Sequence, residues 1–156
     1  MSTLTFDAAD RVRNHTASHI NSLIDERIEH SIRSYASRSP YEISQRIEEL
    51  DREWDVERVL ETNASSLAML GLVLGVTVNR KWLFLTGGVL GFLFMHGTQG
   101  WCPPLPLLRR MGVRTRREID REKYALKQLR GDFRPLGAPP VPEETAAEEA
   151  LAAVED

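Results

Sequence analysis

The sequence has few of the residues and motifs that build redox centres, metal centres or catalytic sites. It contains one cysteine, Cys102, in 156 residues, so neither an internal disulfide nor a four-cysteine zinc site can form. It also lacks a phosphate-binding glycine-rich loop, a Gly-x-Ser-x-Gly motif and a basic helix with interleaved aromatic residues. No motif therefore indicates nucleotide hydrolysis, acyl transfer or nucleic-acid binding. We expect a non-enzymatic protein with no cofactor and no nucleic-acid partner.

Charge is almost absent from residues 64–100, where Arg80 and Lys81 are the only charged residues. On both sides of this pair the sequence is apolar around the whole circumference of a helix, whereas an amphipathic helix of a soluble protein keeps a polar face. We therefore predict a transmembrane helical hairpin with spans of about residues 64–79 and 82–100. The alternative is a hairpin buried in a soluble core. The rest of the chain is too polar to enclose it.

The remaining charge is arranged in blocks. Residues 1–63 hold 13 acidic and 8 basic groups, residues 101–133 have a net charge of +5, and residues 134–156 have a net charge of −5. Arginines flanking the spans outnumber the two cations in the turn, so the positive-inside rule predicts that both termini are cytoplasmic. The flanking residues used here are Arg46, Arg52, Arg58, Arg109, Arg110, Arg114, Arg116 and Arg117.

Two tryptophans bracket the second span. Trp82 and Trp101 lie about 28 Å apart along a helix, close to the thickness of the hydrocarbon core of about 30 Å. Aromatic residues are enriched at both membrane interfaces. We predict that these two residues anchor the hairpin there.

Glycines recur at i, i+4 spacing in both spans, as Gly71 and Gly75 in the first and Gly87 and Gly91 in the second. Small residues at this spacing let two membrane helices approach closely. We predict that the two glycine ridges face each other across a tight turn in which Asn79 adopts the left-handed conformation. Contact of the ridges with another copy or another membrane protein is the alternative.

The chain before the hairpin has two amphipathic patterns. Isoleucines recur every four residues in a helix predicted over about residues 8–36. Ser39, Pro40 and Glu42 form a capping box that opens a second helix over about residues 40–62. We expect an antiparallel pair of cytoplasmic helices, with a dimer through the same faces as the alternative. The apolar face of the second helix carries Ile43, Ile47, Leu50 and Trp54.

After the hairpin, prolines end the second span and residues 101–133 are predicted to form an interfacial turn and an amphipathic cytoplasmic helix. The basic residues of this segment either contact anionic lipid headgroups or act as a topology signal only. Residues 134–156 are rich in Pro, Ala and Glu, and we predict a disordered tail. The cations assigned to headgroups or topology are Arg109, Arg110, Arg114, Arg116 and Arg117.

The stretch GTQGWCPPLPLLRRMGV after a glycine-rich apolar pair resembles the YgaP-like transmembrane domain family, through Gly100, Cys102 and Pro103. The resemblance covers about residues 62–112. It implies a two-helix bacterial inner-membrane domain of unknown function. In the namesake this domain follows a rhodanese, which the helical N-terminal segment here is too short to form, so sulfurtransferase activity is not implied.

Two groups of residues are candidates for redox chemistry or for metal binding. Cys102 is predicted near Arg109 and Arg110, and nearby cations favour the thiolate, with His96 about a turn and a half before Trp101. His15 and His19 have the i, i+4 spacing of paired metal ligands, although a solvated face is the more common role. We expect a membrane anchor or scaffold for a helical interaction module, and the alternative is a sulfur-transfer or redox accessory protein using Cys102.

Overall fold

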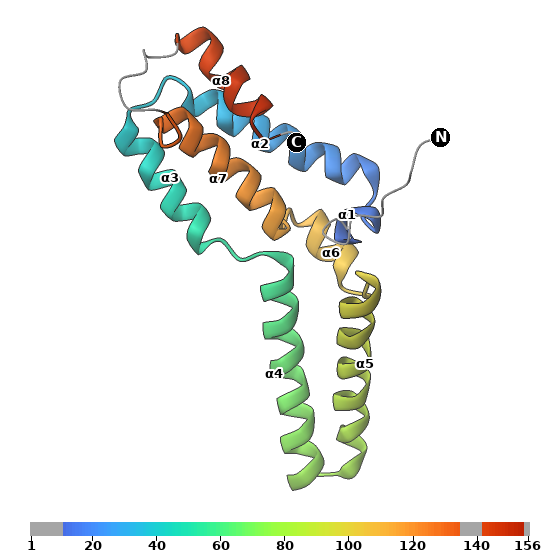
Figure 1. The fold of residues 1–156 in the computed structure, drawn as a ribbon. Coiled ribbons are helices and arrows are strands. Elements are labelled where there is room, and N and C mark those ends of the chain that lie inside the picture. The colour runs from blue at the N-terminus through green and yellow to red at the C-terminus, as the bar shows by residue number, and fades with distance from the viewer. Residues whose placement is uncertain (1–10, 135–141, 155–156) are drawn as a thin grey trace. The chain divides into compact units, whose positions relative to one another are not determined.

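The computed structural model describes residues 11–134 and 142–154, and every regular element in these ranges is a helix (Figure 1). The all-α prediction is confirmed. The helices are α1 (Arg11–Asn14), α2 (Ser18–Tyr35), α3 (Pro40–Arg52), α4 (Val56–Thr77), the 3₁₀ helix η2 (Arg80–Trp82), α5 (Leu83–Gln99), α6 (Leu105–Arg110), α7 (Arg116–Arg130) and α8 (Glu143–Ala152).

The described residues fall into two compact units. The hairpin unit consists of residues 11–20 and 54–115, and the helical module consists of residues 21–53, 116–134 and 142–154. Each unit is therefore built from segments that lie far apart in the sequence. The hairpin unit interrupts the module between α3 and α7.

In the hairpin unit, α4 and α5 run side by side in opposite directions and η2 forms the turn between them (Figure 1). Asp55 caps α4, because its Oδ1 accepts a hydrogen bond of 2.8 Å from the backbone N–H of Arg58. The prediction for Asn79 is wrong. Its φ is −157°, and its side chain instead caps η2 by accepting from the N–H of Lys81 at 2.9 Å.

The glycine ridges do not face each other as predicted. Gly71 and Gly75 are buried against α5, where a Cβ on Gly71 would lie 2.6 Å from Thr86 Oγ1 and one on Gly75 would lie 2.6 Å from Leu83 Cδ2. A Cβ on Gly87 or Gly91 would meet nothing within 4 Å. The ridge of α4 therefore packs on larger residues of α5, since the glycines of α5 lie on another face.

A hydrogen bond joins the two helices at this close approach. The hydroxyl of Thr86 donates to the backbone carbonyl of Ala68 at 3.1 Å. Hydrogen bonds from threonine side chains across helices are a common feature of apolar helix pairs. The contact combines a small residue on one helix with a polar side chain on the other.

The open end of the hairpin, opposite η2, has a small apolar core. Val12 of α1 and Leu105 of α6 pack with Val56 and Leu60 of α4, and Cys102 completes the cluster. The backbone N–H of Val56 also donates to the carbonyl of Arg114 at 2.9 Å. These contacts join the start of α4 to the segment that follows α5.

Two long helices of the sequence prediction are interrupted. The helix expected over 8–36 is divided into α1 and α2, and the helix expected over 40–62 ends at Arg52 before α4 begins. The capping box of Ser39 and Glu42 is confirmed, with Ser39 N–H donating to Glu42 Oε2 at 3.0 Å. Trp54 lies in the interruption and is 46% exposed, because Asp55 starts a new helix where the first was expected to continue.

In the helical module, α3 packs against α7. Ile43, Ile47 and Leu50 form one core cluster with Ile119 and Leu126, and Figure 1 shows α7 running between α2 and α3. The predicted pairing of the helices over 8–36 and 40–62 leaves out the main partner of α3, because its apolar face packs on Ile119 and Leu126 of α7, which was predicted as a separate amphipathic cytoplasmic helix.

A charged network crosses the core of the module. Glu122 of α7 is 1% exposed, and its Oε1 accepts hydrogen bonds from Ser31 Oγ of α2 at 2.7 Å and from Nε of Arg46 of α3 at 3.1 Å. Arg46 also pairs with Glu49 at 3.0 Å on the surface. A buried carboxylate needs such partners to remain charged. Glu122 therefore connects three helices through one oxygen.

The tail differs from the prediction of disorder. Glu143–Ala152 form α8, which packs against α7, with Ala147, Ala150 and Leu151 buried. Alanine and glutamate have high helix propensity, so a segment with few bulky apolar side chains still forms a helix when its alanines and Leu151 can pack. Residues 135–141, 155 and 156 of the predicted tail lie outside the described residues.

Among the described residues, one stretch is long and apolar enough to cross a membrane by length and composition. It is Pro40–Thr77, counted across the short break between α3 and α4. It takes in α3 and α4, and its most apolar window of 18 residues has a mean hydropathy of 1.5. At 17 residues, α5 is shorter than this window. The second span of the sequence prediction therefore does not meet this length.

Candidate functional site

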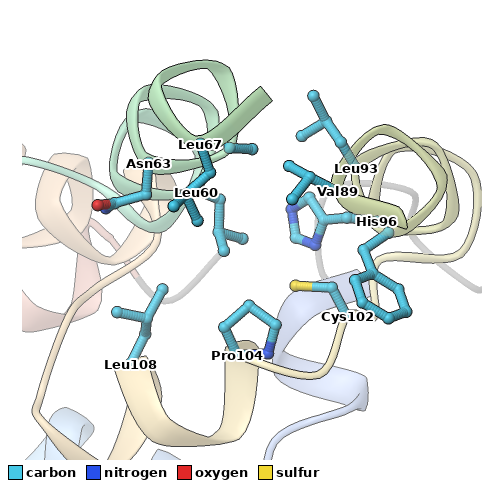
Figure 2. Close-up of a pocket in the computed structure, with 11 residues that line it drawn as sticks. Leu60, Asn63, Leu67, Val89, Leu93, His96, Cys102, Pro104 and Leu108 are labelled. Atoms are coloured by element: carbon cyan, nitrogen blue, oxygen red, sulfur yellow. The ribbon is translucent and has the colours of Figure 1, made fainter. Parts of the chain in front are cut away.

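A cavity of about 350 Å³ lies in the hairpin unit, between α4 and α5 near their open end, and α6 borders it (Figure 2). Its volume is within the range of small-molecule pockets. None of its lining residues is acidic or is a lysine or arginine. The lining residues are Leu60, Asn63, Ala64, Leu67, Val89, Phe92, Leu93, His96, Cys102, Pro104 and Leu108.

The cavity is built by local features of the chain. Gly71 lets α4 approach α5 closely near Thr86, while larger side chains such as Leu67 and Leu93 line the cavity toward the open end. Gly100 ends α5 in the left-handed conformation, with φ 74°. The chain then turns so that Pro104 and Leu108 border the cavity, as Figure 2 shows.

Gly100 has a second role besides ending α5. A Cβ at this position would overlap Cβ of Arg11 and would lie 3.1 Å from its backbone carbon. Glycine is therefore required both by the left-handed backbone and by the close approach of α1. This gives a structural reason for the first residue of the Gly-x-Cys-Pro sequence.

Cys102 is 2% exposed, and burial raises the pKa of its thiol above the ordinary value. The expected activation by neighbouring cations is not what the structure shows. Arg109 is itself 1% exposed and is held by Thr16 Oγ1 at 3.2 Å and by the carbonyl of Val113 at 3.1 Å. Desolvation favours the neutral thiol, so Cys102 acts as an apolar wall of the cavity.

His96 lines the same cavity, and Figure 2 shows its ring on the side where the sulfur of Cys102 lies. The sequence prediction that these two residues approach each other is consistent with this placement. Nδ1 of His96 is buried and makes no hydrogen bond with the described residues. Buried polar atoms are usually hydrogen-bonded, so this atom is available to a ligand.

A second, smaller cavity of about 230 Å³ is also lined by His96. Arg11 of α1 reaches over it and donates to the carbonyl of Gly97 at 2.8 Å. Glu57 and Glu61 of α4 also line it. An apolar cavity and a charged cavity thus share one histidine as a lining residue.

The five arginines assigned to headgroups or topology separate into two groups. Arg109 and Arg114 are buried, so they cannot lie on a lipid surface as predicted. Arg110, Arg116 and Arg117 are exposed. Counting cations along a sequence cannot separate these groups, because burial of an arginine depends on its partners in the fold. Arg109, for example, donates to Thr16 Oγ1 and to the carbonyl of Val113.

The paired histidines do not share one helix. His15 lies in the interruption between α1 and α2, whereas His19 lies in α2, so the i, i+4 spacing does not place them on one face. Nδ1 of His15 interacts with the carbonyl of Arg11 at 2.8 Å. The part of the chain that the structure describes contains no group of three or more His, Cys, Asp or Glu residues that could hold a metal ion.

Trp82 lies just before α5 and Trp101 shortly after it, and they are 43% and 36% exposed. Their role as interface anchors stays a prediction. Comparison with protein-family models, curated proteins and solved structures finds no match to this chain. The resemblance to the YgaP-like domains therefore stays a hypothesis. The function has to be argued from the geometry.

The sequence pointed to two residues of the cavity, Cys102 and His96, and missed its walls. Asn63, Leu67 and Val89 carry no motif, since they differ from other residues of α4 and α5 only by their position. The cavity depends on how far two helices diverge. A pattern of residue types along one helix does not encode that distance.

The raised pKa of Cys102 leads to a prediction about its reactivity. A higher pKa leaves a smaller thiolate fraction at neutral pH, and the thiolate is the reactive form. We expect maleimide labelling of the intact protein at pH 7 to be at least about tenfold slower than that of the denatured chain, and to increase as the pH rises beyond the range of an ordinary thiol. Labelling can be followed by mass spectrometry. Equal rates in the two states would contradict the buried placement.

Proposed function

We propose that this protein is a small integral membrane protein whose α4–α5 hairpin anchors the helical module. The supporting observation is the exposure of large apolar side chains around both helices, since soluble monomers rarely expose contiguous apolar surface of this extent. Only 22% of the apolar window in Pro40–Thr77 is buried. The exposed residues include Leu67, Met69, Leu70, Leu72, Val73, Val76, Val78, Leu83, Phe84, Leu90, Phe92 and Phe94.

The lengths of the two helices fit a bilayer. The 22 residues of α4 correspond to about 33 Å and the 17 residues of α5 to about 26 Å. The hydrocarbon core is about 30 Å thick. In the proposed arrangement, Trp82 and the turn residues Arg80 and Lys81 extend the shorter helix to one interface, and a helix of this length is accommodated by small local adjustments of the bilayer.

The helical module is proposed as the interaction part of the protein. It has its own apolar core and the described part of the chain offers no catalytic cluster, so binding is the role that its surface supports. Its partner is a second copy or another membrane protein. Exposed Arg110, Arg116 and Arg117 are proposed to contact anionic headgroups, where each cation near the surface contributes about 1 kcal/mol.

Membrane insertion is tested by alkaline carbonate extraction. We expect the protein to stay in the membrane fraction, and Leu70→Arg to lower that fraction markedly, because a central arginine costs about 2.5–3.5 kcal/mol on insertion scales. Leu70 is 49% exposed, so the substitution leaves the helix contact intact. Leu107→Arg on α6 is the control, since Leu107 is exposed outside the hairpin. Release of the unaltered protein by carbonate would exclude the proposal.

The proposed orientation places both termini on the cytoplasmic side of a bacterial inner membrane. It rests on the excess of arginine beside the open end compared with Arg80 and Lys81 in the turn. A reporter enzyme active only in the periplasm, fused after Asp156, is expected to be inactive, and the same reporter inserted between Asn79 and Arg80 is expected to be active. The reverse pattern would overturn the orientation and leave membrane insertion untouched.

The sulfur-transfer or redox alternative depends on Cys102 as a nucleophile. Its burial and raised pKa favour the anchor over this alternative. A Cys102→Ser protein that loses its cellular role, together with rapid labelling of the unaltered thiol, would reverse this preference.

A further inference from the structure

The apolar cavity between α4 and α5 opens toward the outer surface of the hairpin. Leu67 and Phe92 line it and are also 46% and 49% exposed, so the cavity is continuous with the apolar surface described above. Its walls extend from Leu60 to Leu67 on α4, about 10 Å along the helix axis. The cavity is thus an apolar slot that runs in the direction of the two helices.

We propose that this cavity binds one acyl chain of a bilayer lipid, with the ester carbonyl of that lipid near His96. The proposal rests on the proposed membrane insertion of the hairpin. In that setting lipid chains lie beside the helices and parallel to them, so a chain enters the slot from the side. The volume of about 350 Å³ suits a single chain and excludes a whole lipid.

The polar atoms of the cavity are placed at the end where an ester group would lie. His96 and Cys102 are near the open end of the hairpin, while Leu67 and Val89 lie further toward the turn, and the amide of Asn63 points away from the cavity (Figure 2) and donates to the carbonyl of Val59. Nδ1 of His96 is buried without a hydrogen bond to the described residues. In the tautomer that carries its hydrogen on Nδ1, this nitrogen donates a hydrogen bond to an ester carbonyl, so the buried atom gains a partner.

An acyl chain fits this cavity better than a segment of another protein. The lining contains no acidic residue, lysine or arginine that would pair with a charged peptide. A backbone inserted here would bring polar groups that one histidine and one asparagine cannot satisfy. An acyl chain has only apolar groups over the length of the slot.

The test uses proteoliposomes that contain a trace of phosphatidylethanolamine with a diazirine in the middle of one acyl chain. After illumination, labelled peptides are located by mass spectrometry. We expect labelling per residue to be at least threefold higher at cavity residues such as Leu67 and Leu93 than at the outer residues Leu72 and Phe84. Even labelling of all four, or cross-links to a second copy of the chain at the cavity, would overturn the proposal.

Two variants fill the slot from opposite walls, Ala64→Phe and Val89→Phe. Each is expected to reduce labelling of Leu93 at least threefold, while Val73→Phe on the outer face of α4 leaves it unchanged. Flotation with the vesicles and helical content by circular dichroism are measured on every sample. If the protein floats with the vesicles but its cavity is not labelled preferentially, lipid binding in the cavity is wrong and the membrane anchor stands. If the protein does not float, the membrane anchor is wrong.

Discussion

Glu122→Gln is expected to destabilise the helical module by about 3 kcal/mol, because the neutral amide loses the charge-assisted hydrogen bonds that the buried carboxylate accepts. Glu122 is 1% exposed and receives hydrogen bonds from Ser31 and Arg46. The amide has no charge to attract the guanidinium. Hydrogen exchange of the full chain in lipid nanodiscs measures the effect, as exchange of α3 and α7 amides about a hundredfold faster.

The control is Glu49→Gln, which removes the other carboxylate paired with Arg46. The side chain of Glu49 is 63% exposed, and exposed ion pairs contribute about 0–1 kcal/mol. We expect little change in exchange. Equal acceleration by both variants would contradict the larger contribution assigned to the buried carboxylate, and unchanged exchange in Glu122→Gln would show that the module does not depend on Glu122.

Gly71→Leu is expected to separate α4 from α5. A Cβ at this position lies 2.6 Å from Thr86 Oγ1, 3.1 Å from the backbone N of Thr86 and 3.2 Å from the carbonyl of Trp82, so the backbone itself has to move. Overpacking of this kind costs about 1–3 kcal/mol, and the hydrogen bond from Thr86 to Ala68 is lost as well. Spin labels at exposed Val73 and Leu90, in a Cys102→Ser background, are expected to show a longer and broader distance distribution.

Gly91→Leu is the matched control, because a Cβ there meets nothing within 4 Å. Leucine has a higher helix propensity than glycine, so we expect the same distance distribution as in the unaltered hairpin. A change in oligomer size with Gly91→Leu, at unchanged distances, would assign the glycines of α5 to contact with another copy. An equal increase in distance for both variants would contradict the packing of α4 on α5 described here.

The local features of this fold could be predicted from the sequence. The capping box of Ser39 and Glu42 acts within one turn, and the apolar character of α4 and α5 follows from the absence of charge between Ala64 and Gly100 apart from the turn. The end of α5 also follows from residues beside it. Such features depend on neighbours in the sequence and need no knowledge of the rest of the chain.

The long-range features could not be predicted in the same way. The apolar face of α3 was visible, but nothing in its periodicity identifies Ile119 and Leu126 of α7 as its partners. The interruption before Asp55 was missed because the apolar spacing continues to Trp54 and predicts one unbroken helix. In the structure Asp55 instead caps the start of a new helix. The walls of the cavity were missed because they depend on the divergence of two helices.

The arrangement of the two cores has a consequence for synthesis on the ribosome. Val12 emerges early, but its partner Leu105 emerges only after the whole hairpin, and α3 likewise waits for α7. Neither core can close while the nascent chain ends before these partners. Domains that are continuous in sequence usually fold in order from the N-terminus during synthesis. Here an N-terminal segment that folded first would lack its contacts with α6 and α7. Completion of the hairpin therefore sets the earliest moment at which either unit can fold.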